Sequence, residues 1–422
     1  MTRVHVVGAG IAGLACAVRL LRQGHTVHVH EAAAHAGGRC RSYHDAKLDR
    51  IIDNGNHLLL AANHAALTYA DEIGARQTLQ GPPHAAFPFM DLRSGERWIV
   101  RPNGGPLPWW LLLPHRRIPH TRPGAYLAGL RLAFAGPDDT VADCLDSDDP
   151  LWERFWEPLT VAALNTAPEE ASARLLWLVV RATFMRGEAA CRPLIARHGL
   201  AASFVDPALA ALRAGGAEIG FNRRLRAIAF AGDRAEHLDF GDSHVDLAEG
   251  DRLVLAVPPT VAATLLPDIE APQEMRPIVN AHIRLPGRPA LPPGLSDDLP
   301  LIGLIGGAAQ WLIVRDDVVS LTVSAAAGLA DESGDDLAGR LWHDAAAALN
   351  LDLPDVPPIR IVKERRATFA QTPQALRLRP PARTRWRNLL LAGDWTDTGY
   401  PATIESAVRS GWAAARACMD SI

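Results

Sequence analysis

The chain has 422 residues, which is enough for two or three domains and a large core. Its formal charge is −4 and it has no long basic run, so nucleic acid is not an expected partner. Five cysteines without metal-ligand spacing argue against a bound metal or a disulfide framework, and they indicate a reducing cytoplasm. No signal peptide or membrane-spanning run is expected, although 48% hydrophobic residues and eleven tryptophans leave contact with a membrane surface open.

The first forty residues carry the strongest pattern in the chain. In chain order it predicts a strand at 3–7, the glycines Gly8, Gly10 and Gly13, a helix from 14 to about 23, a strand at 26–30, and Glu31. The first glycine allows a tight turn, the second lets a pyrophosphate approach the backbone, and the third lets helix and strand pack closely. The helix N-terminus then faces the phosphates, and the acid accepts hydrogen bonds from an adenosine ribose.

Two further motifs follow this dinucleotide signature. Gly37, Gly38 and Arg39 can bring backbone N–H groups and a guanidinium onto the same pyrophosphate, although a surface turn with a solvated arginine also fits them. The sequence DNGNH at 53–57 is either part of the same site or a plain turn, because Asn-Gly is a common turn dipeptide.

The region from 58 to 200 is less regular. Helical periodicity marks 58–80, and helices are expected at 151–164 and 174–186, with a capping box at Thr166 and Glu169. Those helices suit either an ordinary core or a cavity for a long apolar ligand. Before those helices, the Trp-bearing apolar stretch and the arginines of 106–117 fit either a loop packed on its own core or a segment at a bilayer interface.

Alternating helix and strand return after residue 206. A helix at 207–214 and strands at 217–221, 225–230 and 251–257 are expected to continue the nucleotide-binding sheet. Strands at 278–285, 301–305, 310–315 and 318–323, with a helix at 331–349, are expected to form a second domain.

The C-terminus gives the second strong signal. A strand at 388–392 runs into Gly393 and Asp394, and a helix led by Pro401 continues to about Met419. This order puts one carboxylate at the end of the sheet and a helix N-terminus just beyond it. If a flavin is bound, the carboxylate would hold a ribitol hydroxyl and the helix end would face the N1 and C2=O edge of the ring.

The blocks GAGIAGLACAVRLLRQG, GGRCRS and AGDWTDTGYPATIESAVRSG together resemble the FAD-dependent amine oxidase and phytoene desaturase superfamily. Within it, DNGNHLLLA, ERFWEPLTVAALNTAPEEAS and GDWTDTGYPATIES are similar to the hydroxysqualene dehydroxylases. The resemblance implies an α/β fold with a discontinuous Rossmann-type FAD-binding domain at 1–80, 201–270 and 385–422. The inserted α+β substrate domain would take 81–200, as a helical subregion, and 271–384.

The resemblance also implies the activity and its residues. The reaction would replace the allylic hydroxyl of hydroxysqualene by hydride from reduced FAD, giving squalene. Catalysis would fall to His57 as the proton donor, with Asn56 and Asn165 orienting the hydroxyl. FAD would be bound by Gly8, Gly10, Gly13, Glu31, Gly37, Gly38, Arg39, the backbone of Leu225, Gly393, Asp394, Ala402, Thr403 and Ile404.

Three rival functions remain at this point. A carotenoid-type desaturase would run the hydride transfer in the opposite direction. An amine oxidase fits less well, because those enzymes usually carry a lysine near the flavin and the lysines here are Lys47 and Lys363. A prenyl-lipid carrier of the same fold would bind an isoprenoid without redox chemistry, and the intact Glu31, Arg39 and Asp394 argue against it.

Overall fold

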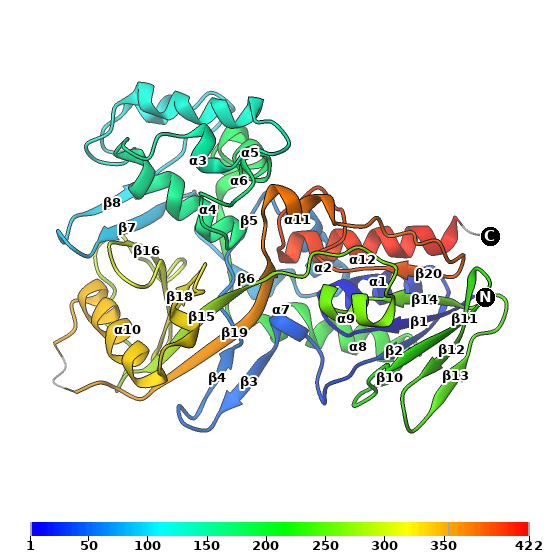
Figure 1. Ribbon diagram of the computed structural model, residues 1–422. Coiled ribbons are helices and arrows are strands. Elements are labelled where there is room, and N and C mark those ends of the chain that lie inside the picture. The colour runs from blue at the N-terminus through cyan, green and yellow to red at the C-terminus, as the bar shows by residue number, and fades with distance from the viewer. Residues whose placement is uncertain (1, 353–354, 421–422) are drawn as a thin grey trace.

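The computed structural model describes residues 2–352 and 355–420. One half of the molecule is built on a five-stranded parallel sheet, on the right of Figure 1, close to both termini. Its strands come from three distant parts of the chain. In spatial order they are β10 (Glu218–Gly220), β2 (Thr26–His30), β1 (Arg3–Val7), β14 (Arg252–Leu255) and β20 (Leu389–Leu391).

Both faces of this sheet are covered, so its strands are apolar on both sides. Val6 belongs to the core on one face and Val7 to the core on the other, as the twofold period of a strand requires. The first face carries α1 (Ile11–Arg22), α2 (His64–Glu72), α7 (Leu200–Phe204), α8 (Asp206–Ala214) and α12 (Ile404–Met419). The second carries α9 (Pro259–Leu265) and a three-stranded sheet of β11 (Ala227–Ala231), β12 (Arg234–Asp239) and β13 (His244–Asp246).

The other half contains a seven-stranded mixed sheet, on the left of Figure 1. Helix α10 (Gly334–Leu349) packs on this sheet, and Ser333 caps its first turn. In spatial order the strands are β19 (Ile359–Phe369), β15 (Met275–Arg284), β18 (Val318–Val323), β17 (Trp311–Arg315), β16 (Leu301–Ile305), β7 (Phe87–Asp91) and β8 (Arg97–Val100).

A helical subregion lies above this sheet, in cyan and green in Figure 1. Its core is rich in aromatic side chains, among them Trp110, Tyr126, Trp152 and Trp156. The subregion consists of η3 (Trp109–Leu112), η4 (Pro123–Phe134), α3 (Val141–Cys144), the π-helical turn η5 (Trp152–Trp156), α4 (Glu157–Leu164), α5 (Ala173–Ala182), η6 (Phe184–Arg186) and α6 (Glu188–Cys191).

Short elements join the halves. The hairpin of β3 (Ser42–Asp45) and β4 (Arg50–Asp53) precedes the DNGNH loop, and β9 (Pro193–Ala196) pairs with both β5 (Leu59–Leu60) and β6 (Leu79–Gln80). The remaining short helices are η1 (Gly38–Cys40), η2 (Arg76–Thr78), η7 (Leu329–Asp331) and α11 (Pro373–Arg377).

Several sequence expectations need correction. Only His64–Glu72 is α-helical within 58–80, because both ends of that stretch pair with β9 as short strands. The capping box at Thr166 and Glu169 is wrong. The Thr166 hydroxyl donates to the Leu164 carbonyl and accepts from the N–H of Gln371, while α5 begins after Ser172. The strand expected at 225–230 begins at Ala227 and continues to Ala231.

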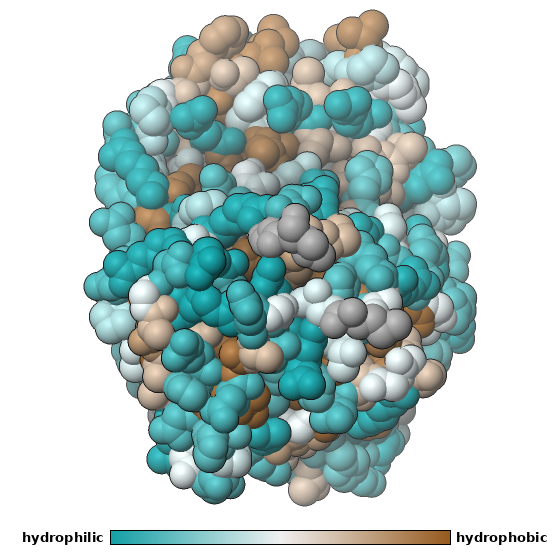
Figure 2. Space-filling model, turned by 90° about the vertical axis from the view of Figure 1, so that its right-hand side faces the viewer, coloured by the Kyte–Doolittle hydropathy of each residue, from teal (hydrophilic) through white to brown (hydrophobic). Residues whose placement is uncertain are grey.

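The surface is mostly polar on the side that carries both termini, shown in Figure 2. Apolar residues gather along the upper edge of that view, the level at which Figure 1 draws the helical subregion. Among the described residues, no helix is both long and apolar enough to cross a bilayer.

Candidate functional site

The glycine turn after β1 has open space beside Gly10, whereas Gly8 and Gly13 are packed against backbone atoms. Gly8 has a φ of +107°, and a Cβ there would come 2.4 Å from the Ala256 carbonyl oxygen. A Cβ on Gly13 would come 1.9 Å from the Gly8 carbonyl oxygen. Nothing lies within 4 Å of a Cβ placed on Gly10, and the N-terminus of α1 has no side-chain cap. The open space and the free N–H groups fit a phosphate.

Glu31 follows β2 at the same edge of the sheet. Its Oε2 accepts a hydrogen bond from the N–H of Ala9 at 2.7 Å, and its Oε1 accepts one from the N–H of Ala33 at 2.8 Å. These bonds hold a half-buried carboxylate beside the glycine turn. The position suits a carboxylate that accepts ribose hydroxyls, as proposed for this residue.

The second glycine pair lies against the first glycine turn. The N–H of Gly37 donates to the Ala9 carbonyl at 2.8 Å, and Gly10 and Gly37 form a β-bridge. A Cβ on Gly38 would lie 3.5 Å from the Cα of Gly10. Two loops separated by more than twenty residues therefore present their backbones to the same space.

Arg39 connects the two ends of the chain. Its Nη2 donates to Asp394 Oδ1 at 2.7 Å, and its Nη1 donates to the Ala367 carbonyl at 2.6 Å. The Asp394 side chain is 6% exposed and that of Arg39 is 38% exposed. Burial lowers the pKa of Arg39, but the charge of Asp394, the hydrogen bond to it and the nearby Cys40 and Glu364 together outweigh burial, so the pKa is raised. Whether the guanidinium also binds the pyrophosphate stays a prediction.

The loop between Asp394 and α12 is held by residues that the sequence did not reveal. The Arg379 guanidinium donates to the carbonyls of Asp394, Thr396 and Tyr400 at 2.6–3.1 Å. Thr403 caps α12 by accepting from the N–H of Ser406. The Ser406 hydroxyl, in the first turn of α12, also donates to the Asp394 carbonyl at 3.3 Å, so the N-terminus of α12 lies next to Asp394.

Two other residues missed by the sequence analysis fix the neighbours of Thr403. The Gln371 Oε1 accepts from the N–H of Ala402 at 2.8 Å. Glu405, 2% exposed, accepts from the N–H groups of Ala65 and Ala66 and so caps α2. Ile404, the first residue of α12, is buried in the same core as α1. The sequence offered one signal for Glu405, because an acidic residue in the first turn of a predicted helix is a candidate for a structural or binding role.

The DNGNH loop is a junction between the two sheets. Asp53 accepts from Arg315 of β17 at 3.0 Å, and the amide of Asn54 donates to Glu364 of β19 at 2.9 Å. The amide of Asn56 donates to the Thr322 hydroxyl of β18 at 3.0 Å. The loop therefore follows the glycine pair and reaches three strands of the seven-stranded sheet.

His57 ends this loop and is partly exposed. Its Nδ1 lies 3.2 Å from the Gly55 carbonyl oxygen, so a hydrogen bond there requires the proton on Nδ1 and leaves Nε2 as an acceptor in the neutral ring. Burial lowers the pKa of His57, and the bond to Gly55 and the charge of Asp53 oppose this shift. At neutral pH the ring is therefore mainly neutral.

Asn165 ends α4 in the left-handed conformation, with a φ of +48°. Its amide donates to the Arg276 carbonyl and the Thr368 hydroxyl, and it accepts from the N–H of Ala325. These bonds join the helical subregion to the seven-stranded sheet. Its proposed role in orienting a hydroxyl stays a prediction, and it would require exchanging one of these bonds.

Leu225 lies just before β11, where the strand was expected to begin. Its side chain is buried in the core that also contains Val7 and Leu255, the last residues of β1 and β14. The side chain thus anchors this segment at the carboxyl edge of the parallel sheet, and a backbone contact with the cofactor stays a prediction.

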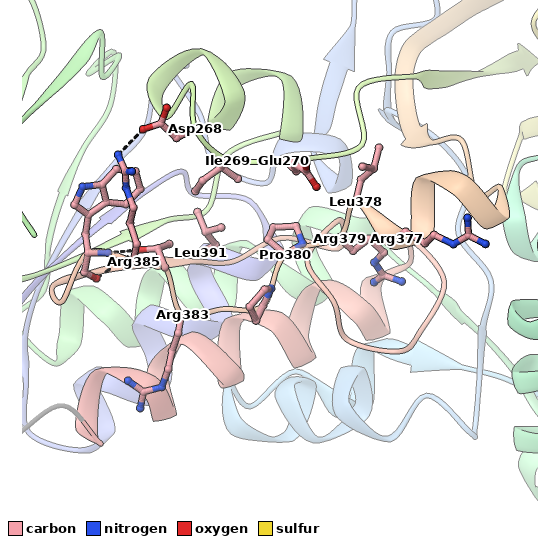
Figure 3. Close-up of a pocket in the computed structure, with 13 residues that line it drawn as sticks. Asp268, Ile269, Glu270, Arg377, Leu378, Arg379, Pro380, Arg383, Arg385 and Leu391 are labelled. Carbon is pink, nitrogen blue, oxygen red and sulfur yellow. Dashed lines mark hydrogen bonds and ion pairs between the residues drawn. The ribbon is translucent and has the colours of Figure 1, made fainter. Parts of the chain in front are cut away.

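An open pocket of about 360 Å³ lies elsewhere, between the end of α9 and the segment 377–391 (Figure 3). Figure 3 shows Arg385 hydrogen-bonded to Asp268 at one end of the pocket, and Arg379 and Arg377 toward the other end. None of the predicted site residues is among the residues that line it. Because its arginines are engaged within the protein, we assign the chemistry to the crevice at Gly10, Arg39 and Asp394 instead.

Comparison with known proteins shows the family of the chain. The family described as flavin containing amine oxidoreductase matches residues 11–419. The chain is 50% identical over 409 residues to the hydroxysqualene dehydroxylase of Rhodopseudomonas palustris, covering 97% of this chain and 96% of that protein. The chain belongs to the hydroxysqualene dehydroxylase family of flavin-containing amine oxidoreductases.

Two other matches of this hydroxysqualene dehydroxylase family member are more distant. The 15-cis-phytoene desaturase of an Oncidium hybrid is 23% identical, over 98% of this chain and 77% of that protein. The crystal structure of cyclohexylamine oxidase from Brevibacterium oxydans superposes with a TM-score of 0.68 at 17% identity, covering 99% of each chain. This likeness confirms the amine-oxidase-like fold.

Neither lysine of this family member, both of them among the described residues, forms a hydrogen bond or ion pair with Gly10, Arg39 or Asp394. Lys363, on β19, donates to the Glu332 carbonyl, and Lys47 is exposed in the turn between β3 and β4. The lysine that amine oxidases usually carry near the flavin has no counterpart among these contacts.

Proposed function

We propose that the chain removes the allylic hydroxyl of hydroxysqualene reductively and forms squalene, with FAD as the flavin. The observation that carries this proposal is the 50% identity to a hydroxysqualene dehydroxylase along nearly the whole chain. Glu31 beside the glycine turn supports FAD rather than a mononucleotide, since its place suits an adenosine ribose. Bound in reduced form, FAD would supply the hydride.

The protein has to protonate and orient the hydroxyl group that leaves the substrate. Breaking the C–O bond releases hydroxide, a poor leaving group, so one proton must reach the oxygen as it leaves and water is the second product. His57 is the proposed donor. With Nδ1 bonded to the Gly55 carbonyl, a protonated ring would present Nε2–H to the substrate. Asn56, tied to Thr322, would orient the hydroxyl.

The central experiment follows flavin and product together. Photoreduced protein is mixed anaerobically with hydroxysqualene, and flavin reoxidation and squalene formation are recorded in a single turnover. Equal amounts of both are expected. If neither occurs while phytoene reduces the oxidised protein, the desaturase is the correct function. A colourless purified protein that extracts isoprenoid would instead indicate a carrier.

The role of His57 has its own test. His57→Ala is expected to keep bound FAD and to lose at least tenfold in the single-turnover rate, within the range typical of a lost general acid. Because the pKa of His57 is lowered, the wild-type rate should rise as pH falls below the ordinary histidine value of about 6.5. His84→Ala, at a strongly exposed histidine, is the control. An unchanged rate in His57→Ala would remove His57 from the mechanism.

The location of the protein and its domain limits are also proposals. The reducing cytoplasm fits the five unpaired cysteines, which are Cys16, Cys40, Cys144, Cys191 and Cys418. We draw the FAD-binding domain at 1–80, 201–270 and 385–422, because these segments supply the strands of the parallel sheet. The isoprenoid substrate is insoluble in water, so contact with a membrane is part of the proposal.

A further inference from the structure

Exposed apolar side chains are concentrated in one part of the molecule. Nine large apolar side chains are strongly exposed in the described part of the chain, and six of them fall between residues 107 and 134. We call these six the 107–134 surface. They are Leu107 (77% exposed), Trp109 (48%), Leu112 (66%), Leu127 (63%), Leu130 (43%) and Phe134 (88%).

The geometry of η4 explains how one helix buries one row of residues and exposes another. In a 3₁₀ helix the side chains at i and i+3 lie directly above one another. Tyr126, Gly129 and Leu132 form the row that faces the core. Leu127 and Leu130 form the neighbouring row, which is exposed. The exposed leucines therefore follow from the helical repeat itself, and they project from a helix whose opposite row is packed.

The segment is held firmly against the body of the subregion. A Cβ added at Gly129 would lie 2.4 Å from Trp156 Cη2, so the backbone of η4 packs directly on the Trp156 ring. Trp110 is buried beside Tyr126, and its backbone N–H donates to Asn103 Oδ1 at 2.9 Å. The 107–134 surface is thus a fixed part of the fold that presents apolar groups outward.

The charge of this segment has one sign. Residues 101–136 contain five arginines and two histidines and no aspartate or glutamate, in a chain whose formal charge is −4. Arg122 and Arg131 are exposed, and the Arg116 guanidinium lies 5.1 Å from the centre of the Trp109 ring. Apolar and aromatic groups flanked by arginines match the acyl boundary and the anionic headgroups of a lipid surface.

We propose that the 107–134 surface docks the protein on an anionic lipid bilayer. The apolar side chains enter the acyl boundary and the arginines contact acidic headgroups. The surface belongs to the same subregion that Asn165 joins to the substrate-domain sheet. Only the purpose of docking, which is to collect an oily substrate, rests on the proposed function, because vesicle binding requires no turnover.

The test uses the full-length, FAD-loaded protein in vesicle flotation. Vesicles of phosphatidylcholine alone are compared with vesicles containing about one third phosphatidylglycerol. Wild-type protein is expected to float with the anionic vesicles. The combined variant Leu127→Glu, Leu130→Glu and Phe134→Glu is expected to bind at least tenfold more weakly, with unchanged FAD content and melting temperature, because all three side chains are exposed.

A second variant separates charge from apolar contact. Arg116→Gln, Arg122→Gln and Arg131→Gln together should remove the preference for anionic vesicles and the loss of binding with added salt. Ile51→Glu is the matched control, because Ile51 is 64% exposed on β4, outside this surface. It should bind as the wild type does.

Three outcomes would overturn the proposal. The first is wild-type protein that does not float with either vesicle. The second is triple-glutamate protein that floats like wild type. The third is a concentration-dependent dimer, seen by analytical ultracentrifugation, that the glutamates abolish, which would make the surface a subunit contact. Failure of dehydroxylation alone would contradict the proposed function and leave vesicle binding intact.

Discussion

A Cβ on Gly13 would lie 1.9 Å from a carbonyl oxygen, whereas Leu127 and Phe134 are 63% and 88% exposed. The crevice and the 107–134 surface therefore tolerate change very differently. In the crevice, backbone atoms approach so closely that a single methyl group decides whether the turn forms. At the surface, the proposed partner is fluid and only apolar character and charge matter. Four predictions sharpen this contrast.

The largest effect is expected at Gly13. Gly13→Ala forces the turn between β1 and α1 apart, so the protein should purify without FAD or fail to fold. The ratio of flavin to protein absorbance measures this. Gly339→Ala, where the added Cβ meets open space within α10, should retain FAD and stabilise the fold by about 0.5–1 kcal/mol. Full FAD occupancy in Gly13→Ala would contradict the role of this close approach.

The next effect concerns the Arg39–Asp394 pair. Arg39→Met leaves a buried carboxylate without its cation, and because Arg39 is partly exposed we expect a loss of about 1–3 kcal/mol, together with weaker FAD binding. Adding Asp394→Leu should restore part of the stability but not the affinity. Thermal melts and FAD titration separate the two. If Arg39→Met alone leaves the affinity for FAD unchanged, the Arg39–Asp394 pair has only a structural role.

Acid should weaken the parallel sheet before it affects the 107–134 surface. Burial lowers the pKa of His5 on β1 to about 4 and that of His30 on β2 to about 3, with neighbouring histidines adding to both shifts. Between pH 6.5 and 4 the unfolded chain binds protons that the folded sheet does not. Stability is therefore complete above pH 6.5 and falls as the pH drops below it.

The expected loss between pH 7 and pH 5 is about 2 kcal/mol for each histidine. Denaturant unfolding at the two values measures it. In the double variant His5→Leu and His30→Leu, the difference between the two pH values should shrink. If that variant keeps the full pH dependence, the loss has another origin.

The effect expected under the 107–134 surface is the most local of the four. Gly129→Ala pushes on the Trp156 ring, which has to shift, at a cost of about 1–3 kcal/mol within the helical subregion. FAD content should not change. Near-ultraviolet circular dichroism reports the tryptophan. Gly124→Ala, where a Cβ meets open space in the same helix, is the control and should leave the spectrum unchanged.

The strands that the sequence did not reveal show where local pattern fails. The strand β19 carries Lys363, Glu364 and Arg365 in its middle, which hides any apolar alternation. Each has a partner outside the strand, namely the Glu332 carbonyl, Asn54 and Asp331. Tertiary contacts thus permit charges that a single-strand pattern counts against. A tertiary contact also explains why the predicted helix cap at Thr166 is wrong. The Thr166 hydroxyl accepts a hydrogen bond from the backbone N–H of Gln371 instead of capping a helix.

The glycines at 8, 10 and 13, the acid at 31 and the Gly-Asp after the last strand could be recognised from the sequence, because each stands at a fixed position within a short strand-turn-helix segment. The hydroxysqualene dehydroxylase resemblance came from the same blocks. Only the tertiary structure decided that Arg39 meets Asp394, that Arg379 holds the final loop and that the DNGNH loop ties two sheets together. Those partners lie tens to hundreds of residues apart in the chain, and no local period links them.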